Sequence, residues 1–385
     1  MKLDIKSWKE VEFGDVVSNN TKSVKDPLKN SIKYALGLEN FEPENLNPVS
    51  WIDIEKDGTK FSRYFEKGQL LFGARRSYLK QMIIAPFNGV CTANIMVFDT
   101  KNSSRISREY IALVFQSNKF IDFASGTSVG SLFPNAKWNS LSKFKFKLPV
   151  PEIQKEIVQL FSILQDQIDQ TKEQEKNLLQ TKRQLLNELF SEKGEFGDYL
   201  TSDNYKTVSF GELAQNMSKR VEPSQTDLKV YVGLEHLDPD NLRIERQGIP
   251  DDVKGVKLLI WEGDIIFGKR RAYQRKVAVS HFDGICSAHS MVLRANEKAV
   301  KKEFLPFFMQ SDVFMDRAIQ ISEGSLSPTI KWKVLEKQEF SIPKVDFQEK
   351  LTDLFKQFDK LIYQLREQNQ TLKKLKNQLL DEILG

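Results

Sequence analysis

Hydrophobic side chains recur every seven residues in two long segments of the chain, residues 157–189 and 351–383. In each segment a second series follows four residues after the first, and this spacing places both series on one face of an α-helix. The first series contains Ile157, Leu164, Leu178 and Leu185 in the earlier segment and Leu351, Phe358, Leu372 and Leu379 in the later one. The pattern predicts two long helices that pair with each other through this seam as a coiled coil.

The two seams are interrupted by polar residues at matching positions. Glu175 and Lys182 of the first seam correspond to Asn369 and Lys376 of the second. Polar residues in a coiled-coil seam commonly fix the register of the paired helices, at a cost in stability. The alternative is that each helix packs on a globular domain, although helices packed in that way rarely keep a seven-residue repeat for so long.

Short apolar runs separated by Gly, Pro and Asn precede each helical segment. Residues 69–72, 81–85 and 94–98 have the length and the β-prone composition of strands. Residues 107–122 change to helical spacing after a capping serine, and a corresponding helix is predicted over residues 302–319. We therefore predict an α+β fold for the parts of the chain that precede the long helices.

The chain contains two copies of one unit, separated by about half of its length. Matching segments occur in the same order at residues 37–46 and 233–242, 64–78 and 259–273, and 130–138 and 324–332. The separation is far longer than the roughly 20 to 50 residues of solenoid repeats. Each copy is therefore expected to be a domain, and a duplicated domain suits a partner that itself has two parts.

The repeat divides the chain into four predicted parts. We expect two similar globular domains, each followed by a long helix, over residues 1–149, 150–196, 197–343 and 344–385. If the halves are related by a pseudo-two-fold axis, the helices are antiparallel and return the end of the chain to its start in a cyclic arrangement. A helix of about 40 residues spans roughly 60 Å. One turn of B-DNA spans about 34 Å, so two domains joined in this way could contact one duplex one to two turns apart.

The composition is that of an ordinary globular protein, with 40% hydrophobic and 28% charged residues. No apolar run approaches the ~18 residues of a membrane span, and residues 1–6 lack a signal-peptide core. We therefore expect a soluble, cytoplasmic protein. Cys91 and Cys286 occupy equivalent positions in the two copies, so a disulfide would have to join separate domains, and buried free thiols are the better prediction.

The net charge is only +5, which is far below the excess of a strongly basic DNA-binding protein. Nucleic-acid binding would therefore depend on where the basic residues lie on the surface rather than on their number. The motif Gly-x-Arg-Arg-x-Tyr-x-Lys/Arg occupies residues 73–80 and returns at residues 268–275, each time between two predicted strands. We call these two segments the arginine loops. Arginine contacts guanine edges and phosphates, and tyrosine adds a hydrogen bond or a flat contact surface. The alternative is a solvated hairpin with the tyrosine packed on its base, but the duplication favours DNA binding.

The candidate DNA-binding residues form two groups. The arginine loops contribute Arg75, Arg76, Tyr78 and Lys80 in the first copy and Arg270, Arg271, Tyr273 and Arg275 in the second. A broader basic face is predicted from Lys22, Arg63, Lys137, Lys219, Arg220 and Lys331. Trp138 and Trp332 follow the repeated Gly-Ser-Leu segments and are expected to anchor those loops on each domain.

Sequence patterns for catalysis are nearly absent. The three histidines all lie in the second copy, and the chain has no Walker loop, no Gly-x-Gly-x-x-Gly motif and no metal-ligand spacing. We therefore predict no catalytic residue, no metal site and no cofactor in this chain.

The combined motifs resemble those of the specificity subunits of type I restriction-modification systems, over essentially the whole chain. They are Gly-Leu-Glu-x-x-x-Pro-x-Asn-Leu at 233–242, Glu-x-Gly-Asp-Ile-Ile-Phe-Gly-x-Arg-Arg-x-Tyr at 262–273, and the helix starts Gln-Lys-Glu-Ile at 154–157 and Gln-Glu-Lys-Leu at 348–351. The resemblance implies two target-recognition domains, each recognising one half of a bipartite DNA site, with the helix pair setting the spacer between the halves.

The resemblance also implies protein partners. Two methyltransferase subunits would dock on the helices and motor-nuclease subunits would join them, and S-adenosylmethionine, ATP and Mg would belong to those partners. Because the arginine loops differ at Ala74/Lys269, Ser77/Ala272 and Leu79/Gln274, we expect related but unequal half-sites. Two alternatives stay open, namely a coiled-coil protein scaffold without sequence-specific DNA binding and a self-sufficient methyltransferase or nuclease.

Overall fold

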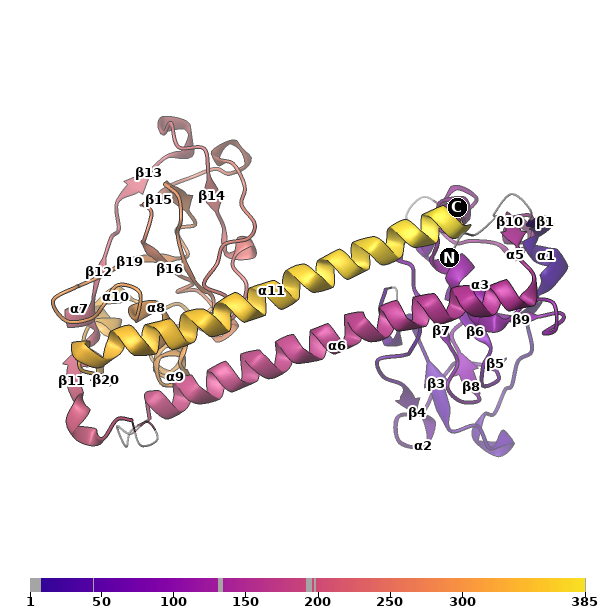
Figure 1. Cartoon of the computed structure of the whole chain (residues 1–385), viewed down its shortest axis with the longest axis horizontal. Helices are drawn as coiled ribbons and strands as arrows, with labels where there is room; N and C mark the ends of the chain where they lie inside the picture. The colour runs from indigo at the N-terminus through magenta and orange to yellow at the C-terminus, as the bar shows by residue number, and fades with distance from the viewer. Residues whose placement is uncertain (1–7, 44, 131–133, 192–195, 197–198, 385) are drawn as a thin grey trace. The chain divides into compact units, whose positions relative to one another are not determined.

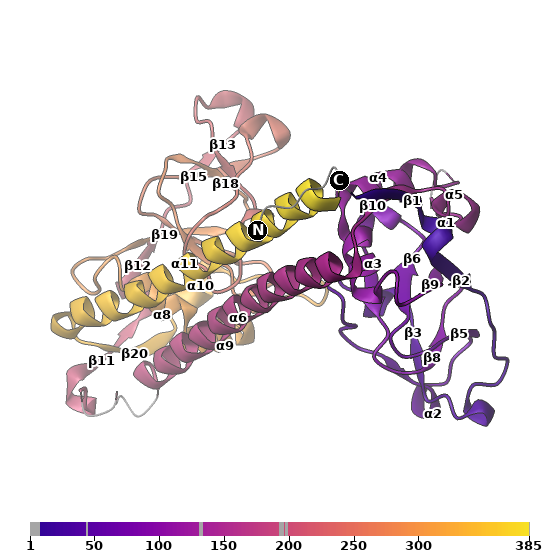
Figure 2. The same ribbon diagram turned by 45° about the vertical axis from the view of Figure 1, so that its right-hand side comes forward.

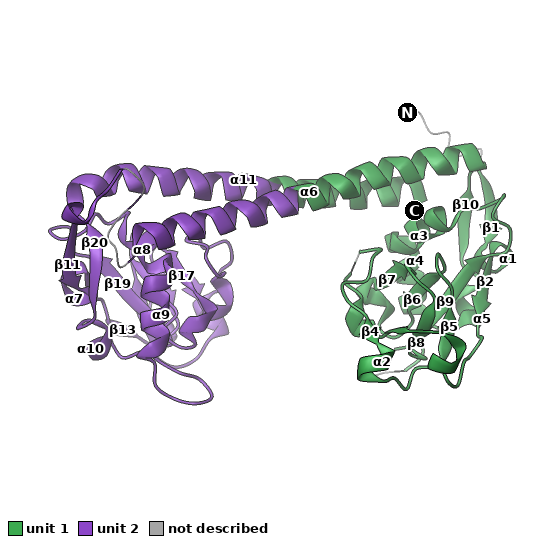
Figure 3. Cartoon of the chain, turned by 90° about the horizontal axis from the view of Figure 1, so that it is seen from below, with its two compact units in different colours: residues 1–170, 368–385 green, residues 171–367 purple. Residues whose placement is uncertain are grey.

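The computed structural model describes residues 8–43, 45–130, 134–191, 196 and 199–384. They form two compact units, residues 1–170 with 368–385 and residues 171–367 (Figure 3). Each unit contains a globular domain and parts of two long helices, α6 (Pro151–Leu189) and α11 (Val345–Leu384). The first unit is therefore built from two segments that lie far apart in the sequence, whereas the second unit is one continuous segment.

The first globular domain contains two four-stranded sheets and a two-stranded ribbon (Figure 1). One sheet has the order β2-β9-β6-β7 and contains β2 (Val17–Asn20), β6 (Leu70–Gly73), β7 (Met82–Ile84) and β9 (Ile95–Thr100). The other has the order β4-β3-β8-β5 and contains β3 (Tyr34–Leu36), β4 (Ile52–Asp53), β5 (Arg63–Phe65) and β8 (Gly89–Cys91). The ribbon pairs β1 (Lys9–Glu12) with β10 (Lys145–Leu148). The three predicted strands are confirmed as β6, β7 and β9.

The second globular domain repeats this arrangement. Its first sheet, β12-β19-β16-β17, contains β12 (Ala214–Asn216), β16 (Ile265–Phe267), β17 (Val277–Val279) and β19 (Met291–Ala295). Its second sheet, β13-β15-β18-β14, contains β13 (Arg220–Val221), β14 (Tyr231–Val232), β15 (Lys257–Ile260) and β18 (Gly284–Cys286), and its ribbon pairs β11 (Tyr205–Ser209) with β20 (Glu339–Pro343). The copies differ at opposite edges of this second sheet, because β4 is added beside β3 in the first domain and β13 is added beside β15, the counterpart of β5, in the second. The α+β prediction and the internal repeat are confirmed.

Short helices cover the first sheet of each domain. They are α1 (Phe13–Val16), α3 (Arg108–Gln116), α4 (Asn118–Gly126) and α5 (Trp138–Leu141) in the first domain and α7 (Phe210–Leu213), α8 (Leu305–Gln310), α9 (Asp312–Gln320) and α10 (Trp332–Leu335) in the second. Their apolar faces share one core with the sheet, where for example the ring centroids of Phe72 and Phe115 lie 5.4 Å apart. A further short helix, α2 (Ile54–Asp57), packs on the second sheet of the first domain instead.

The prediction of a single helix over residues 107–122, and of another over 302–319, is wrong. Each is broken at a buried serine, Ser117 or Ser311, whose backbone is extended. The hydroxyl of each serine accepts a hydrogen bond from the backbone N–H three residues later, so it caps the helix that follows. The break turns the chain at the point where α4 and α9 begin.

The long helices run antiparallel to each other within each unit. In the first unit Asn369 donates to the carbonyl oxygen of Ile168 at 2.8 Å, and Lys376 donates to Gln165 at 2.8 Å. In the second unit Arg366 lies 2.7 Å from Glu175, and Lys182 lies 2.5 Å from Asp359. In each unit the residue numbers of the contact partners fall along α11 as they rise along α6, so the two helices are antiparallel (Figure 2). The polar seam positions Glu175, Lys182, Asn369 and Lys376 each make one of these contacts.

The ends of the long helices also belong to the globular cores. Ile157 and Phe161 join the first core together with Leu380 and Ile383 of α11. In the second core the long helices contribute Leu186 and Leu189 of α6 and Leu351 and Phe355 of α11. Of the eight predicted seam residues, Ile157 and Leu351 are buried and the other six are half-buried. Pairing between helices and packing on a domain therefore both occur, and the supercoil geometry of a coiled coil stays a prediction.

The two cysteines are free and buried, as predicted. Burial raises the pKa of each thiol to about 12, so both stay protonated and unreactive. None of the helices in the described ranges is long and apolar enough to cross a membrane.

Candidate nucleic-acid interface

Both arginine loops have the same uncommon backbone conformation. The first connects β6 to β7 and the second connects β16 to β17, each through a short 3-10 turn. Arg76 and Arg271 have φ values of 56° and 58°, and Lys80 and Arg275 have φ values of 50° and 54°. Left-handed backbone is unfavourable for residues with a side chain, and such strain clusters at functional sites. Basic residues in place of glycine at all four positions indicate that these side chains are needed.

A second loop braces each arginine loop. The backbone N–H of Arg76 donates to the carbonyl oxygen of Pro134 at 2.9 Å, and that of Arg271 donates to Pro328 at 2.8 Å. Both proline residues lie in the repeated Gly-Ser-Leu segments, residues 130–138 and 324–332, which we call the Gly-Ser-Leu loops; residues 131–133 lie outside the described residues. The rings of Trp138 and Trp332 pack against buried phenylalanines at the ends of these loops, which confirms their predicted anchoring role.

Large side chains on these loops are exposed. Tyr78 is 54% exposed and Tyr273 is 53% exposed, so the alternative in which the tyrosines pack on the base of the hairpin is wrong. Leu326, at the tip of the second Gly-Ser-Leu loop, is 90% exposed. Burying an apolar side chain is favourable, so a leucine presented in this way next to arginines suits contact with a partner surface. Leu326 was not among the predicted residues, although it belongs to the repeated Gly-Ser-Leu motif.

Cations gather beside the second arginine loop. Arg270 lies 3.1 Å from the imidazole of His289, between Nη1 and Nε2. Burial lowers the pKa of His289, and the charges of Arg270, Lys269 and Lys257 lower it further. Burial likewise lowers the pKa of Lys269, followed by the charge of Arg220. These positive groups repel one another, and an anion bound among them would relieve this repulsion. His289, Lys257 and Lys269 were not among the predicted residues.

The last cation of each arginine loop is directed to the protein instead. The ammonium of Lys80 donates to the side chain of Asn118 at 2.9 Å. Arg275 is bonded to Asp240 at 2.8 Å and to Asp312 at 2.7 Å, and its side chain is only 13% exposed. The guanidinium of Arg275 is already paired with two carboxylates of the protein. Arg275 therefore stabilises the domain and does not contribute to an exposed basic surface.

The broader basic face is only partly assembled. Arg63 is half-buried and donates to the carbonyl oxygen of Ile95 at 2.6 Å, which ties two sheets together. Lys22 is exposed and lies over the ring of Tyr64, with the ammonium 4.7 Å from the ring centroid. Lys137 and Lys331 are exposed on the Gly-Ser-Leu loops, although Lys331 is paired with Glu323 at 2.6 Å. Lys219 and Arg220 are exposed at β13.

The positions that differ between the arginine loops are not all available for contact. Ala74, Ser77 and Ala272 are buried, each 2% exposed. Leu79 is exposed, whereas Gln274 and Lys269 are half-buried. Among the differing positions, only Leu79, Gln274 and Lys269 are therefore at least partly accessible to a ligand.

Comparisons with known proteins agree on one family. A family model described as "Type I restriction modification DNA specificity domain" matches residues 5–181 and 203–376. The chain is similar to the type I restriction enzyme EcoDI specificity subunit of Escherichia coli, with 23% identity over 219 residues that cover 56% of this chain and 48% of that protein. It therefore matches only about half of that relative. It is also similar to the type I restriction enzyme MjaIX specificity subunit of Methanocaldococcus jannaschii, with 23% identity over 418 residues that cover 99% of this chain and 92% of the relative.

A solved structure shares the fold. It is described as "Structural basis underlying complex assembly and conformational transition of the type I R-M system". The match has a TM-score of 0.61 and 18% identity and covers 98% of this chain and 97% of that one. The likeness extends over both units, so the family match and the internal repeat describe the same two domains.

Proposed function

Because the chain belongs to the type I restriction-modification DNA specificity family, we propose that it is the DNA-recognition subunit of such a system. The observation that carries the proposal is the duplication of the strained arginine loop within two domains that both match the family model. Each loop presents an exposed tyrosine and an exposed arginine beside a bracing loop. Two such surfaces in one chain suit a DNA site that has two halves.

Each domain recognises one half-site in this proposal. Arg76 and Arg271 are the exposed arginines, and bidentate contacts from arginine to guanine edges are the commonest base-specific contacts in the major groove. Tyr78 and Tyr273 supply hydrogen bonds to phosphate or a flat surface against the sugar and base. The second domain adds the cations around His289, whereas the corresponding residue of the first domain is Asn94. The half-sites are therefore related but unequal.

The long helices set the spacer and dock the methyltransferase subunits, and motor-nuclease subunits complete the assembly. Adenine methylation and ATP-driven cleavage belong to those partners, as do S-adenosylmethionine, ATP and Mg. The support for this division of labour is the family membership together with the absence of cofactor motifs from the sequence. The chain itself is a non-catalytic subunit in this proposal.

The proposal is tested by footprinting the chain, in complex with methyltransferase subunits of the same system, on a duplex library with random sequence. We expect two short protected and specified segments separated by a spacer of unspecified sequence. Protection without any sequence preference would instead support the scaffold alternative. In a parallel titration, S-adenosylmethionine is expected not to bind the isolated chain, and stoichiometric binding would support the self-sufficient enzyme.

The pKa of His289 should rise when DNA binds. In the free protein, burial and the neighbouring cations hold this pKa below its ordinary value, which favours the neutral imidazole. A phosphate or a base acceptor stabilises the protonated form, so DNA binding is expected to take up a proton and to strengthen as the pH falls from about 8 to about 6. The measurement is the titration of the His289 imidazole resonance with and without DNA, with His236 and His281 as internal controls. A pKa that is unchanged or lower in the complex would contradict the assignment.

A further inference from the structure

The end of each arginine loop is connected to the first residue of a short helix. In the first unit Lys80 donates to Asn118, which begins α4, at 2.9 Å. In the second unit Arg275 donates to Asp312, which begins α9, at 2.7 Å. Both short helices begin at the serine breaks, so these breaks place the same corner of the domain next to the loop in both copies.

That first residue is connected in turn to a long helix. Asn118 donates to Asp381 of α11 through its side-chain amide at 2.7 Å and through its backbone N–H at 3.2 Å. In the second unit, the side chain of Asn187 of α6 donates to Asp312 at 2.5 Å and accepts from the backbone N–H of Asp312 at 2.9 Å. The acid and the amide have exchanged places between the copies, yet the pair of hydrogen bonds is the same.

The connection in the second unit is the more strongly charged. Arg183 of α6 also bonds to Asp312, at 2.9 Å from Nε, and Arg275 is held by Asp312 and Asp240 together. Burial acts to raise the pKa of Asp312, but the hydrogen bonds from Arg183 and Asn187 and the charge of Arg275 outweigh it, so the pKa lies below its ordinary value. The carboxylate is therefore charged at neutral pH and fully occupied.

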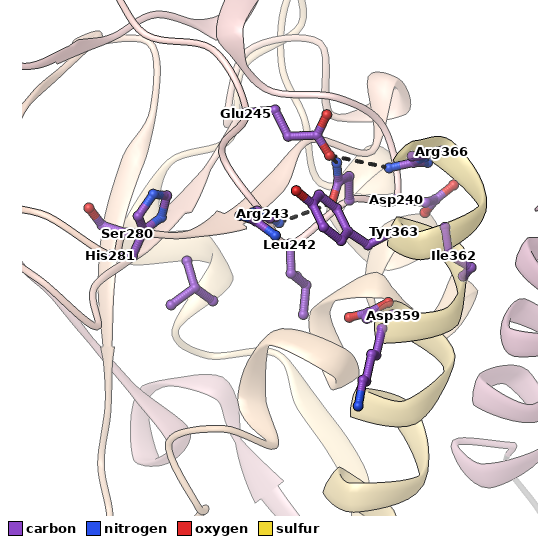
Figure 4. Close-up of a pocket in the computed structure, with 13 residues that line it drawn as sticks. Asp240, Leu242, Arg243, Glu245, Ser280, His281, Asp359, Ile362, Tyr363 and Arg366 are labelled. Carbon is purple, nitrogen blue, oxygen red and sulfur yellow. Dashed lines mark hydrogen bonds and ion pairs between the residues drawn. The ribbon is translucent and has the colours of Figure 1, made fainter. Parts of the chain in front are cut away.

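The same loop end reaches the other long helix through the segment that contains Asp240. In this segment Arg243 lies over the ring of Tyr363 of α11, 4.0 Å from its centroid, and Glu245 lies 3.9 Å from Arg366 of the same helix (Figure 4). The same four residues line a cavity of about 580 Å³ between the segment and the helix. The contacts are thus local points of attachment rather than a continuous packed surface.

A buried lysine fixes the two long helices at the same corner. Lys182 of α6 is 3% exposed and donates to Asp359 of α11 at 2.5 Å and to Gln310 at the end of α8 at 2.7 Å. A buried charge that loses its partner is strongly unfavourable, so movement of one helix along the other would be resisted here. Gln310 also accepts from Arg275 through its backbone carbonyl, so the loop end and the helix pair share one residue.

We propose that Asn187–Asp312–Arg275 in the second unit, and Asp381–Asn118–Lys80 in the first, are positioning residues that couple each arginine loop to the long helix beside it. Occupation of a half-site and the placement of the helix then affect each other. Directional bonds of a planar guanidinium and of paired amides transmit small displacements, because a shift of about one ångström breaks them. This inference rests on the proposed function for its DNA readout, but the coupling itself is a property of the free chain.

The test replaces the helix residue and leaves the loop unchanged. We expect Asn187→Ala to lower the discrimination between the correct and a scrambled second half-site by on the order of 10-fold, with the first half-site unaffected. The double variant Asn187→Asp with Asp312→Asn transposes the pair into the chemistry of the first unit and should restore discrimination. Gln184→Ala removes an exposed side chain of the same helix and should have no effect. The complex with methyltransferase subunits is used throughout.

Hydrogen exchange in the free chain separates this inference from the proposed function. In Asn187→Ala the amides of residues 271–275 are expected to exchange faster than in the parent chain and in Gln184→Ala, at an unchanged thermal midpoint. Unchanged exchange together with unchanged discrimination would overturn the coupling. Equal losses at both half-sites with a lower thermal midpoint would also overturn it, because they would indicate a general structural role. A parent chain without any half-site preference would refute the proposed function, while faster loop exchange would still support the coupling.

Discussion

Replacing Arg270 and Arg271 together by alanine is expected to weaken binding of the correct bipartite site by at least about 30-fold. Each arginine that contacts a base edge is worth roughly 1–3 kcal/mol, and each that contacts a phosphate contributes about one unit to the salt dependence of binding. Arg271 is exposed, and Arg270 lies beside His289 among cations that an anion would stabilise. The loss should therefore come with relaxed sequence preference in the second half-site alone.

The measurement is a binding titration with methyltransferase subunits present, on duplexes in which either half-site is scrambled, at two salt concentrations. The control variant is Lys298→Ala with Lys302→Ala, which also removes two exposed positive charges from the second domain. Both lysines follow β19 and lie outside the arginine loop. An equal loss in this control would show that the arginine loop has no special role. If the loss of affinity is the same on the correct site and on both scrambled duplexes, the arginines contribute only sequence-independent electrostatic attraction.

Removing one heptad from each long helix is expected to shorten the preferred spacer by about three base pairs. The segments to delete are residues 169–175 and 366–372, which face each other because Glu175 pairs with Arg366 and Ile168 with Asn369. Seven residues span about 10 Å of helix, and base pairs are about 3.4 Å apart. A whole heptad keeps the remaining seam residues in phase, so pairing of the shortened helices is retained.

The readout is binding and methylation on a set of duplexes with the same half-sites and different spacers. The control keeps the helix length and replaces the exposed residues Lys172, Glu173 and Gln174 by alanine, and it should prefer the original spacer. If the shortened chain is folded and still prefers the original spacer, the helix pair does not set it. Loss of binding to every spacer, with both domains folded, would contradict the account equally.

The sequence predicted the helices and strands well where the spacing of apolar residues determines the type of element. The strands at residues 69–72, 81–85 and 94–98 are present because alternating or continuous apolar runs bounded by turn residues leave few other choices. The breaks at Ser117 and Ser311 could not be predicted in the same way. A serine inside an apolar helical pattern is compatible with a continuous helix, and only the tertiary packing makes it a cap.

The long helices show a second limit. A seven-residue repeat identifies an apolar face but not what covers it. Leu186 and Phe355 are covered by the second domain, whereas Lys182 and Asn369 contact the partner helix or lie beside it. Residue order alone cannot separate these cases, because both domain cores and helix partners select the same apolar spacing.

The sequence identified the segments that form the candidate site, but not which of their side chains are exposed. Within the arginine loops, Tyr273 and Arg275 are two residues apart, yet one is exposed and the other is held by carboxylates. Asp240 and Asp312 reach Arg275 from more than thirty residues away on either side, so no local pattern marks that pairing. The left-handed backbone at Arg271 and Arg275 is equally invisible in the sequence.

The most direct test of the central claim is a map of methylated adenines in the DNA of cells that carry the complete system. The account predicts one bipartite motif, with two short specified segments at a fixed separation. In cells whose chain carries Arg270→Ala and Arg271→Ala, the second segment should lose its sequence preference while the first keeps it. A single continuous motif, or a motif whose two halves both survive these substitutions, would contradict recognition of one half-site by each arginine loop.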